Sequence, residues 1–257
     1  MREDIKFLIV GDTIIDEDIF LIASGLSLET PTLKTVYDTN RFNYGGAANV
    51  ARRLADYDLN VTFLTSVSEE HVNSISSTGA KILNFYQGKN NTKSRYWVSR
   101  GDSTYKYLQV NSVNDENLHP LIDVNLSDYD IVAFSDYRCG LITEPFINTC
   151  VKHKGIETYA SSQISSRQSN YFLYNKVDYI VCNEKESRSV GRDSNICVTK
   201  GDKGCSFKGI DYEGYKVEDA VSTMGAGDAF YAAFLASGDP EFANMEASNF
   251  VESLSYV

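Results

Sequence analysis

Short apolar runs rich in β-branched and aromatic residues recur along this chain. They lie at residues 5–10, 61–65, 131–135, 179–182 and 196–199. Runs of four to eight such residues are typical of strands buried on both faces, as the strands of a parallel sheet are. A membrane-spanning helix needs about 20 apolar residues, so these runs indicate a parallel sheet and no transmembrane segment.

Helical segments separate the runs. Residues 47–57 (AANVARRLADY) follow a Gly-Gly pair and repeat apolar side chains at helical spacing. Residues 144–154 form a second such segment. A strand, a helix and a strand in succession predict right-handed crossovers between parallel strands. We therefore expect an α/β fold with a doubly wound core.

Two other stretches alternate polar and apolar residues with a period of two, which is typical of strands with one exposed face. The first comprises residues 14–22 and 33–38. The second comprises residues 93–99 and 104–110, separated by the turn sequence RGDS. These strands do not fit the parallel core, so they predict a separate antiparallel sheet.

This sheet is expected to be a small antiparallel β lid, with its strands within residues 13–40 and 92–112. No linker rich in Pro, Gly or Ser divides the chain, which predicts one domain over residues 1–257. A lid of this kind has unpaired edges and an apolar face. We therefore expect it to close on a ligand or to form a homodimer with a second copy.

Charge and cysteine content narrow the class of protein. The chain has 35 acidic and 24 basic side chains and a formal net charge of -11, so its surface repels a nucleic-acid backbone. Its five cysteines show no CxxC spacing and predict reduced, mostly buried thiols. The first residues, MREDIKF, lack an apolar signal region. These features predict a cytoplasmic protein with no nucleic-acid and no membrane partner.

A glycine-rich turn before a helix is the strongest chemical signal, in the sequence STMGAGDAF at residues 222–230. The small residues Gly225, Ala226 and Gly227 let a ligand approach the backbone closely. Amides at a helix start attract an anion, such as a phosphoryl group. The carboxylate of Asp228 could accept a proton from an attacking hydroxyl. Taken alone, the segment is more typical of an ordinary helix start with a capping acid.

Two further polar segments follow expected strands. Asn183 and Glu186 come after the run at 179–182 and offer hard oxygen atoms suited to hydrated Mg²⁺. Thr199 and Gly201, in the sequence TKGDKG, offer a hydroxyl and a flexible backbone to phosphate oxygens. Alone, the first segment also fits a solvated helix start and the second a hairpin turn.

The order NxxE, TxGxxG and GAGD resembles the ribokinase, or PfkB-type, family of carbohydrate kinases. This resemblance implies a ribokinase-like fold and an ATP- and Mg²⁺-dependent enzyme. It assigns Asp228 as the catalytic base and the amides of Gly225, Ala226 and Gly227 as an anion hole.

The same resemblance assigns ligand contacts in both halves of the chain. Thr199 and Gly201 would meet the nucleotide phosphates, while Asn183 and Glu186 would organise Mg²⁺ and its water shell. In the N-terminal half, the sequences GDTIID and GGAANVA are similar to family motifs that face the sugar. The residues that these motifs assign to the substrate are Asp16, Gly45, Gly46 and Asn49.

Several segments are similar to the heptose 7-phosphate kinases within that family: SLETP, YGGAANV, TKSR and SDYRCG. This similarity implies that a sugar phosphate is the acceptor and that Lys93 and Arg95 hold its phosphate. Two residues apart on one strand, these side chains share a face of the lid, and Arg can bind phosphate with two hydrogen bonds. Both also fit exposed charges of an ordinary strand.

Three departures from the pattern bear on the function. Cys139 stands where the heptose kinases have Lys, Ser222 replaces the usual Asp before the GAGD motif, and residues 159–163 lack an Asp-Pro-Lys sequence. The leading hypothesis is phosphorylation of the anomeric hydroxyl of heptose 7-phosphate. A kinase for a different sugar is the second. A non-catalytic sugar- or nucleotide-binding protein is the third, favoured by Ser222 and by the shortened C-terminus.

Overall fold

The computed structural model describes residues 1–77, 79–86, 88–113, 124–163, 169–191, 195–218 and 220–254. Its strands are β1 Lys6–Gly11, β2 Thr13–Leu26, β3 Leu33–Gly46, β4 Asn60–Thr65, β5 Lys81–Asn84, β6 Thr92–Arg100, β7 Ser103–Ser112, β8 Ile131–Asp136, β9 Glu157–Ser162, β10 Tyr179–Asn183, β11 Ile196–Thr199, β12 Cys205–Phe207 and β13 Ile210–Tyr212. Its α-helices are α1 Ala47–Asp56, α2 Glu69–Ser76, α3 Glu144–Lys152, α4 Glu184–Ser187, α5 Ala226–Ser237 and α6 Pro240–Ser253.

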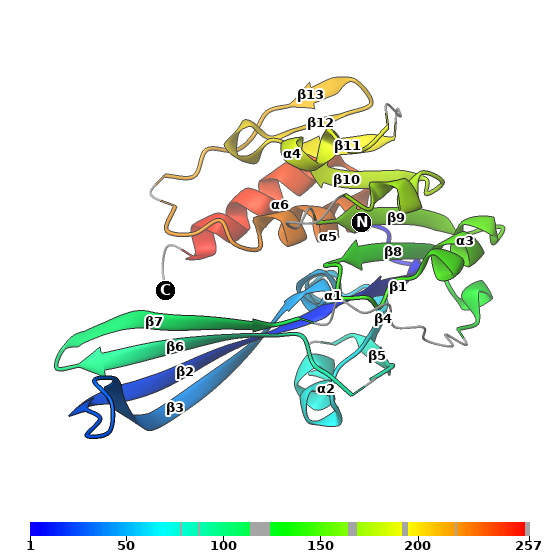
Figure 1. The fold of residues 1–257 in the computed structure, drawn as a ribbon. Coiled ribbons are helices and arrows are strands. Elements are labelled where there is room, and N and C mark those ends of the chain that lie inside the picture. Colours follow the sequence, from blue (N-terminus) through cyan, green and yellow to red (C-terminus); the bar gives the residue numbers. More distant parts are fainter. Residues whose placement is uncertain are drawn as a thin grey trace.

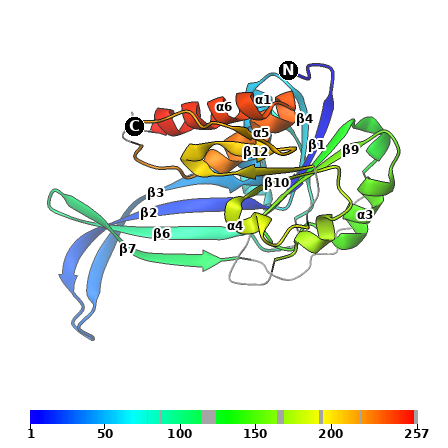
Figure 2. The ribbon, with the colours of Figure 1, turned by 90° about the horizontal axis from the view of Figure 1, so that it is seen from above.

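The large sheet has nine strands in the order β13-β12-β11-β10-β9-β8-β1-β4-β5. The strands from β11 to β5 are parallel, and β12 and β13 add an antiparallel edge. Helices α1, α5 and α6 pack on one face, and α3 packs on the other (Figures 1 and 2). This arrangement confirms the doubly wound α/β core.

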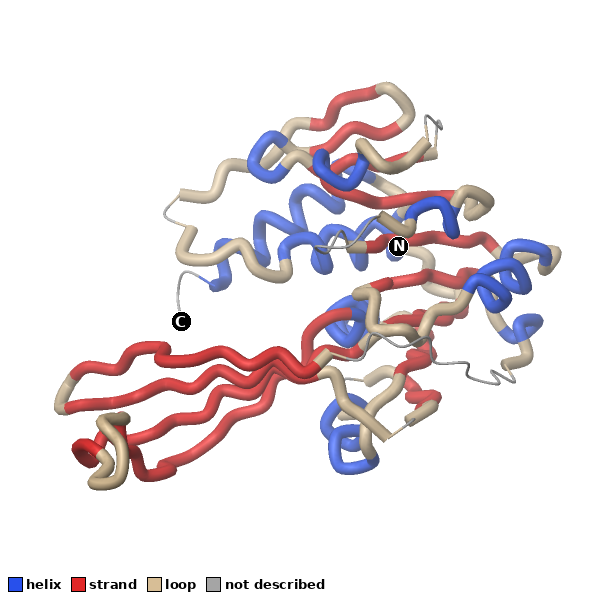
Figure 3. Tube along the Cα trace, viewed as in Figure 1, coloured by secondary structure: helices blue, strands red, loops and turns tan. Residues whose placement is uncertain are grey.

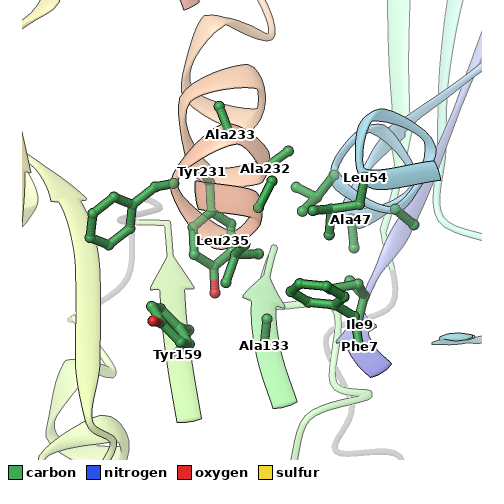
Figure 4. Close-up of a cluster of buried hydrophobic side chains, with 14 of the residues drawn as sticks. Phe7, Ile9, Ala47, Leu54, Ala133, Tyr159, Tyr231, Ala232, Ala233 and Leu235 are labelled. Atoms are coloured by element: carbon green, nitrogen blue, oxygen red, sulfur yellow. The ribbon is translucent and has the colours of Figure 1, made fainter. Parts of the chain in front are cut away.

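Helix α5 is the centre of the core on its side of the sheet. Residues 229–236 are all buried, because the helix lies between the sheet and α6. Tyr231 and Leu235 extend toward Ala133 of β8 and Tyr159 of β9 (Figure 4), and the Tyr231 hydroxyl donates a hydrogen bond to the carbonyl of Phe134 at 3.1 Å. This packing fixes the position of the α5 N-terminus relative to the strand ends.

The second sheet has four strands in the order β3-β2-β6-β7. As expected, β2 pairs with β3 and β6 pairs with β7 in antiparallel fashion, but the central pair β2 and β6 is parallel. The sheet is therefore mixed, because the chain passes through the core between its two hairpins. Strand β3 also extends beyond the expected limit at residue 40 and leads directly into α1. The lid projects away from the helices of the core (Figure 3).

The thiol prediction is confirmed: all five cysteines are buried and free of disulfides. Within the described residues, no helix is long and apolar enough to cross a membrane.

Candidate active site

The parallel strands bring distant motifs to one edge of the large sheet. Asp12 follows β1, while Asp136, Asn183 and Thr199 end β8, β10 and β11. The order of these strands places all four residues at the same, carboxyl-terminal edge. In an open α/β sheet this edge is where ligands bind. The start of α5 lies above it.

Gly225 caps the start of α5 in a left-handed backbone conformation, with φ of 87°. A Cβ atom there would also lie 3.2 Å from the ring of Phe250. The amide of Ala226 donates to the carbonyl of Thr223 at 3.2 Å. The next two amides, of Gly227 and Asp228, have no acceptor in a preceding helical turn, so they are the donors that the helix start presents to an anion.

Asp228 is partly buried and held through both carboxylate oxygens. The Tyr137 hydroxyl donates to Oδ1 at 2.5 Å, and Asn49 Nδ2 donates to Oδ2 at 3.1 Å. Burial raises the pKa of Asp228, while the two hydrogen bonds and the charges of Arg53 and Lys93 oppose that rise. A carboxylate in such surroundings can take up a proton near neutral pH more readily than an exposed one.

The expected sugar-binding residues gather next to Asp228. A Cβ atom at Gly45 would lie 3.0 Å from Asp16 Oδ2 and 3.9 Å from Asn49 Nδ2, so glycine permits this close approach. Gly46 has a φ of 66° and forms the N-cap of α1, which carries Asn49 toward the base. The structure thus brings the two halves of the chain together around one carboxylate.

Two cationic side chains of the lid lie beside the residues around Asp16. Arg95 forms an ion pair with Asp16 at 2.7 Å, and both side chains are largely buried. Lys93 lies opposite Asp16 in the pairing of β2 with β6. Burial raises the pKa of both Asp228 and Cys139, and the charge of Lys93 opposes the rise in each, so its ammonium lies near both groups. As expected, the two cations share one face of the lid.

A cavity of about 220 Å³ opens on the other side of the α5 N-terminus. Its lining includes two residues expected at the nucleotide phosphates, one glycine of α5 and several apolar side chains: Thr199, Gly201, Gly227, Val217, Phe230 and Val251. The apolar part of this lining suits a planar base, and Thr199 and Gly201 offer polar groups to phosphates.

A smaller cavity of about 110 Å³ lies beside Asp228. It shares Thr199 and Gly227 with the larger cavity and includes Asp228, Asn183 and Glu186 in its lining. A Cβ atom at Gly227 would meet nothing within 4 Å, so its backbone is open to both spaces. The two cavities therefore lie next to each other, and Asp228 lines the smaller one.

Asn183 and Glu186 hold each other at the start of α4. The Asn183 side chain accepts a hydrogen bond from the Glu186 amide, and Glu186 Oε2 accepts one from the Asn183 amide, both at 2.9 Å. This capping box is the structural role that the sequence also allowed. It leaves further lone pairs on hard oxygen atoms beside the small cavity. Two such oxygens fit a hydrated Mg²⁺ held through water.

Some residues of this site lay outside the sequence prediction. Tyr137 stands in the SDYRCG segment, but no residue pattern linked it to Asp228, 91 positions away. Asp12 stands in the GDTIID segment, where only its neighbour Asp16 was assigned. Cys139, at the position of the heptose kinases' Lys, is buried, and burial beside Asp12 and Asp136 raises the pKa of its thiol. A neutral thiol there provides no charge for a phosphate.

Sequence comparison finds the profile described as pfkB family carbohydrate kinase, which matches residues 5–239. Among curated relatives, the Bifunctional protein HldE of a Nitratiruptor species is 23% identical over 199 residues, which is 72% of this chain and 42% of that protein. The Bifunctional protein HldE of Campylobacter jejuni subsp. jejuni serotype O:6 is 24% identical over 95% of this chain. The chain spans 59% of that second relative.

Solved structures agree on the fold. Arabidopsis thaliana ribokinase, complexed with ribose and ATP, superposes with a TM-score of 0.70 at 17% identity, covering 98% of this chain and 93% of the other. The expected ribokinase-like fold is thereby confirmed. Because the family profile covers most of the residues, the chain belongs to the pfkB family of carbohydrate kinases, and it is a sugar kinase.

Proposed function

We propose that this kinase transfers the γ-phosphoryl group of ATP to the anomeric hydroxyl of heptose 7-phosphate. The observation that carries the proposal is the position of Asp228. It lines the smaller cavity, which shares Thr199 and Gly227 with the larger one. Its carboxylate also accepts a hydrogen bond from Asn49, on the side where Asp16 pairs with Arg95. The HldE relatives support a heptose as acceptor, although their identity is low and the chain spans only part of them.

In the proposed reaction, Asp228 accepts the proton of the anomeric hydroxyl as that oxygen attacks the γ-phosphorus. The amides of Gly227 and Asp228 donate hydrogen bonds to the charge that develops on the transferred group. Mg²⁺, held through water by Asn183 and Glu186, would neutralise charge on the phosphates. Closure of the lid over the sugar would exclude water from the phosphoryl group.

ATP would occupy the larger cavity, with its phosphates toward Thr199 and Gly201. Phe230 and Val251 supply apolar surface for the base. The ATP-bound ribokinase of similar fold supports this assignment of the donor. Use of ATP also supports our expectation that the enzyme works in the cytoplasm.

The acceptor's own phosphate requires positive charge within a chain of net charge -11. Lys93 and Arg95 supply it on the face of the lid that carries Asp16. Lys93 lies near Cys139, so its ammonium provides the charge that the neutral thiol cannot. This position supports a sugar phosphate over an unmodified sugar.

A different sugar is the second candidate, and one observation favours it. Residues of the small cavity include Ser161 and Gln163, where the heptose kinases have an Asp-Pro-Lys sequence. A site with hydroxyl and amide groups in place of a carboxylate and an ammonium could select another acceptor. The family assignment leaves little support for the third hypothesis, a non-catalytic binding protein.

We also propose a homodimer through the lid. In the pairing of the lid strands, Ile19, Tyr96 and Leu108 lie side by side, and Phe42 and Val110 lie on the same face. We call these five residues the apolar face of the lid. Phe42, Leu108 and Val110 are each more than two fifths exposed. A second copy could cover this face and leave the charged face for the substrate.

The test of the acceptor is a panel of sugars incubated with ATP and Mg²⁺, with the product identified by phosphorus NMR. Heptose 7-phosphate, heptose, ribose and fructose 6-phosphate are compared at equal concentration. The proposal predicts the highest kcat/KM for heptose 7-phosphate and a new phosphate at the anomeric position. A preference for an unphosphorylated sugar would contradict the heptose-phosphate assignment and favour the second candidate.

A further inference from the structure

Tyr137 makes the shortest contact to the proposed base, yet neither the GAGD motif nor the family resemblance gives it a role. Its hydroxyl donates to Asp228 Oδ1 at 2.5 Å. This distance is at the short end for a hydroxyl donating to a carboxylate, where the hydrogen bond is charge-assisted and strong. Asn49 holds only the other oxygen of the same carboxylate.

The backbone around Tyr137 is held in place by two buried carboxylates. Asp12 Oδ2 accepts hydrogen bonds from the amides of Tyr137 and Cys139, both at 3.1 Å. Asp136 Oδ1 accepts one from the amide of Arg138 at 2.7 Å. Arg138 has a φ of 63°, a left-handed conformation that a non-glycine residue adopts only when its surroundings enforce it.

The two carboxylates that hold this segment are themselves fixed by burial and by further hydrogen bonds. Asp12 itself is almost completely buried, and Asp136 also accepts hydrogen bonds from Ser162, Asn170 and Tyr174. The network therefore fixes a loop whose Tyr137 hydroxyl contacts the carboxylate proposed as the base. Strained, over-determined backbone of this kind is common at functional sites.

We propose that Tyr137 is a positioning residue for Asp228, which fixes the orientation of the carboxylate and keeps it ionised for the attacking hydroxyl. This inference rests on the proposed role of Asp228 as base. A carboxylate oxygen has two lone pairs, so Oδ1 can accept from Tyr137 and still face the acceptor.

Other charged and polar groups also act on Asp228 and Tyr137, and they determine how the pKa of Asp228 responds to a substitution of Tyr137. Asn49 and Arg53 of α1 and Lys93 of β6 act on Asp228, and each favours its ionised form. Burial raises the pKa of the Tyr137 phenol, and the charges of Asp228, Glu186 and Asp16 raise it further. Tyr137 therefore remains a neutral donor throughout the working pH range.

Removing the phenol hydroxyl should raise the pKa of Asp228 further, because burial then acts against one fewer donor. In Tyr137→Phe, the acid limb of kcat/KM should move to higher pH. On that limb kcat/KM should fall about tenfold relative to the unmodified enzyme, the effect of losing one charge-assisted hydrogen bond, while the plateau changes less.

Tyr171→Phe is the matched control. Tyr171 is buried and its hydroxyl donates to the carbonyl of Ser162 at 2.5 Å, away from Asp228. This variant loses a buried hydroxyl of the same type, so it should lower the melting temperature without moving the acid limb. An equal shift in both variants would show that general loosening of the fold is responsible and would overturn the proposal.

Asp228→Asn and the double variant separate this proposal from the function it rests on. If Tyr137 acts through Asp228, then Tyr137→Phe should cost little further activity in the Asp228→Asn background. Full activity of Asp228→Asn would show that Asp228 is not the base, which would overturn the proposed function as well. An inactive Asp228→Asn together with an unshifted acid limb in Tyr137→Phe would overturn only the role of Tyr137.

If Tyr137→Phe fails to fold, site-specific 3-fluorotyrosine at position 137 replaces it. This residue keeps the shape of tyrosine but has a more acidic hydroxyl, which is a stronger donor. The acid limb should then move to lower pH, and an unchanged or raised limb would contradict the proposal.

Discussion

At the scale of single residues, Arg95 tests the identity of the acceptor. Arg95→Ala should raise KM for the sugar phosphate roughly 10- to 150-fold, because a charge-assisted hydrogen bond is worth about 1.5 to 3 kcal/mol. It should leave KM for ATP and kcat nearly unchanged, since the contact is made equally in the ground and transition states. Steady-state kinetics in both substrates check this.

Arg100→Ala is the control for this prediction, because Arg100 lies on the same strand and is exposed at its far end. It should leave both KM values unchanged. Equal losses for ATP and for the sugar phosphate in Arg95→Ala would show that the ion pair with Asp16 serves only to support the lid.

The buried carboxyl group of Asp12 should make the free energy of unfolding depend on pH. Burial, with the nearby charge of Asp136, raises the pKa of Asp12 to about 7. In the unfolded chain an Asp has a pKa near ~3.9. The folded state therefore binds the extra proton between about pH 4 and pH 7, and its stability falls as pH rises through that window.

The Asp12→Asn variant removes this titration. The free energy of unfolding of the unmodified protein, measured relative to Asp12→Asn, should fall on the order of a few kcal/mol between pH 4 and pH 8. Urea unfolding at several pH values measures it. Parallel pH profiles for the two proteins would show that the protonation of Asp12 does not change on unfolding, and would contradict this prediction.

At the scale of elements, the first turn of α5 offers a matched pair of variants. Gly225→Ala places a Cβ in a left-handed conformation against Phe250, which should lower the free energy of unfolding by about 1 to 2 kcal/mol. Gly227→Ala meets open space and gains helix propensity, so stability should hold or rise.

The activity of Gly227→Ala should not follow its stability. The new methyl group of Gly227→Ala projects beside both cavities, so ATP affinity and kcat should fall although the fold is intact. Chemical unfolding and calorimetric ATP titration measure the two effects. If Gly227→Ala bound ATP normally and kept full kcat, the amides of this turn would have no role at the phosphates.

Elements with a strong local pattern were predictable from the sequence. The parallel strands are continuous apolar runs, and α1 starts at a glycine pair, so β1, β8 and α1 lie within one or two residues of expectation. Strand β13 has three residues and no periodicity that could reveal it. The parallel pairing of β2 with β6 joins segments about 80 residues apart, and no local signal encodes it.

The site was predictable to the extent that its motifs are contiguous. GAGD, Asn183 with Glu186, and Gly45 with Gly46 each lie within four consecutive residues, so their positions at helix starts could be inferred from the sequence. The hydrogen bond from Tyr137 to Asp228 depends on how β8 and α5 pack against each other. The ion pair of Arg95 with Asp16 depends on the pairing of β2 with β6. Such contacts join residues far apart in the chain, so the sequence alone does not reveal them.

At the scale of the whole molecule, the apolar face of the lid predicts self-association. Leu108→Asp places a charge in the middle of this face and should convert a dimer to a monomer, because the buried charge would have no partner. Sedimentation at micromolar concentration measures the oligomeric state. Gln109→Asp, on the opposite face, is the control. A monomeric unmodified protein whose lid stays open with ligand bound would contradict the dimer.

The central claim is that the whole chain assembles a phosphoryl-transfer site around one carboxylate, and Asp228→Asn tests it most directly. The measurement is ADP formation with heptose 7-phosphate, alongside calorimetric ATP binding. The account predicts that kcat falls about 10² to 10⁴-fold, as for loss of a general base, while ATP binds with unchanged affinity. Turnover within a few-fold of the unmodified enzyme would contradict the assignment of Asp228 as the base.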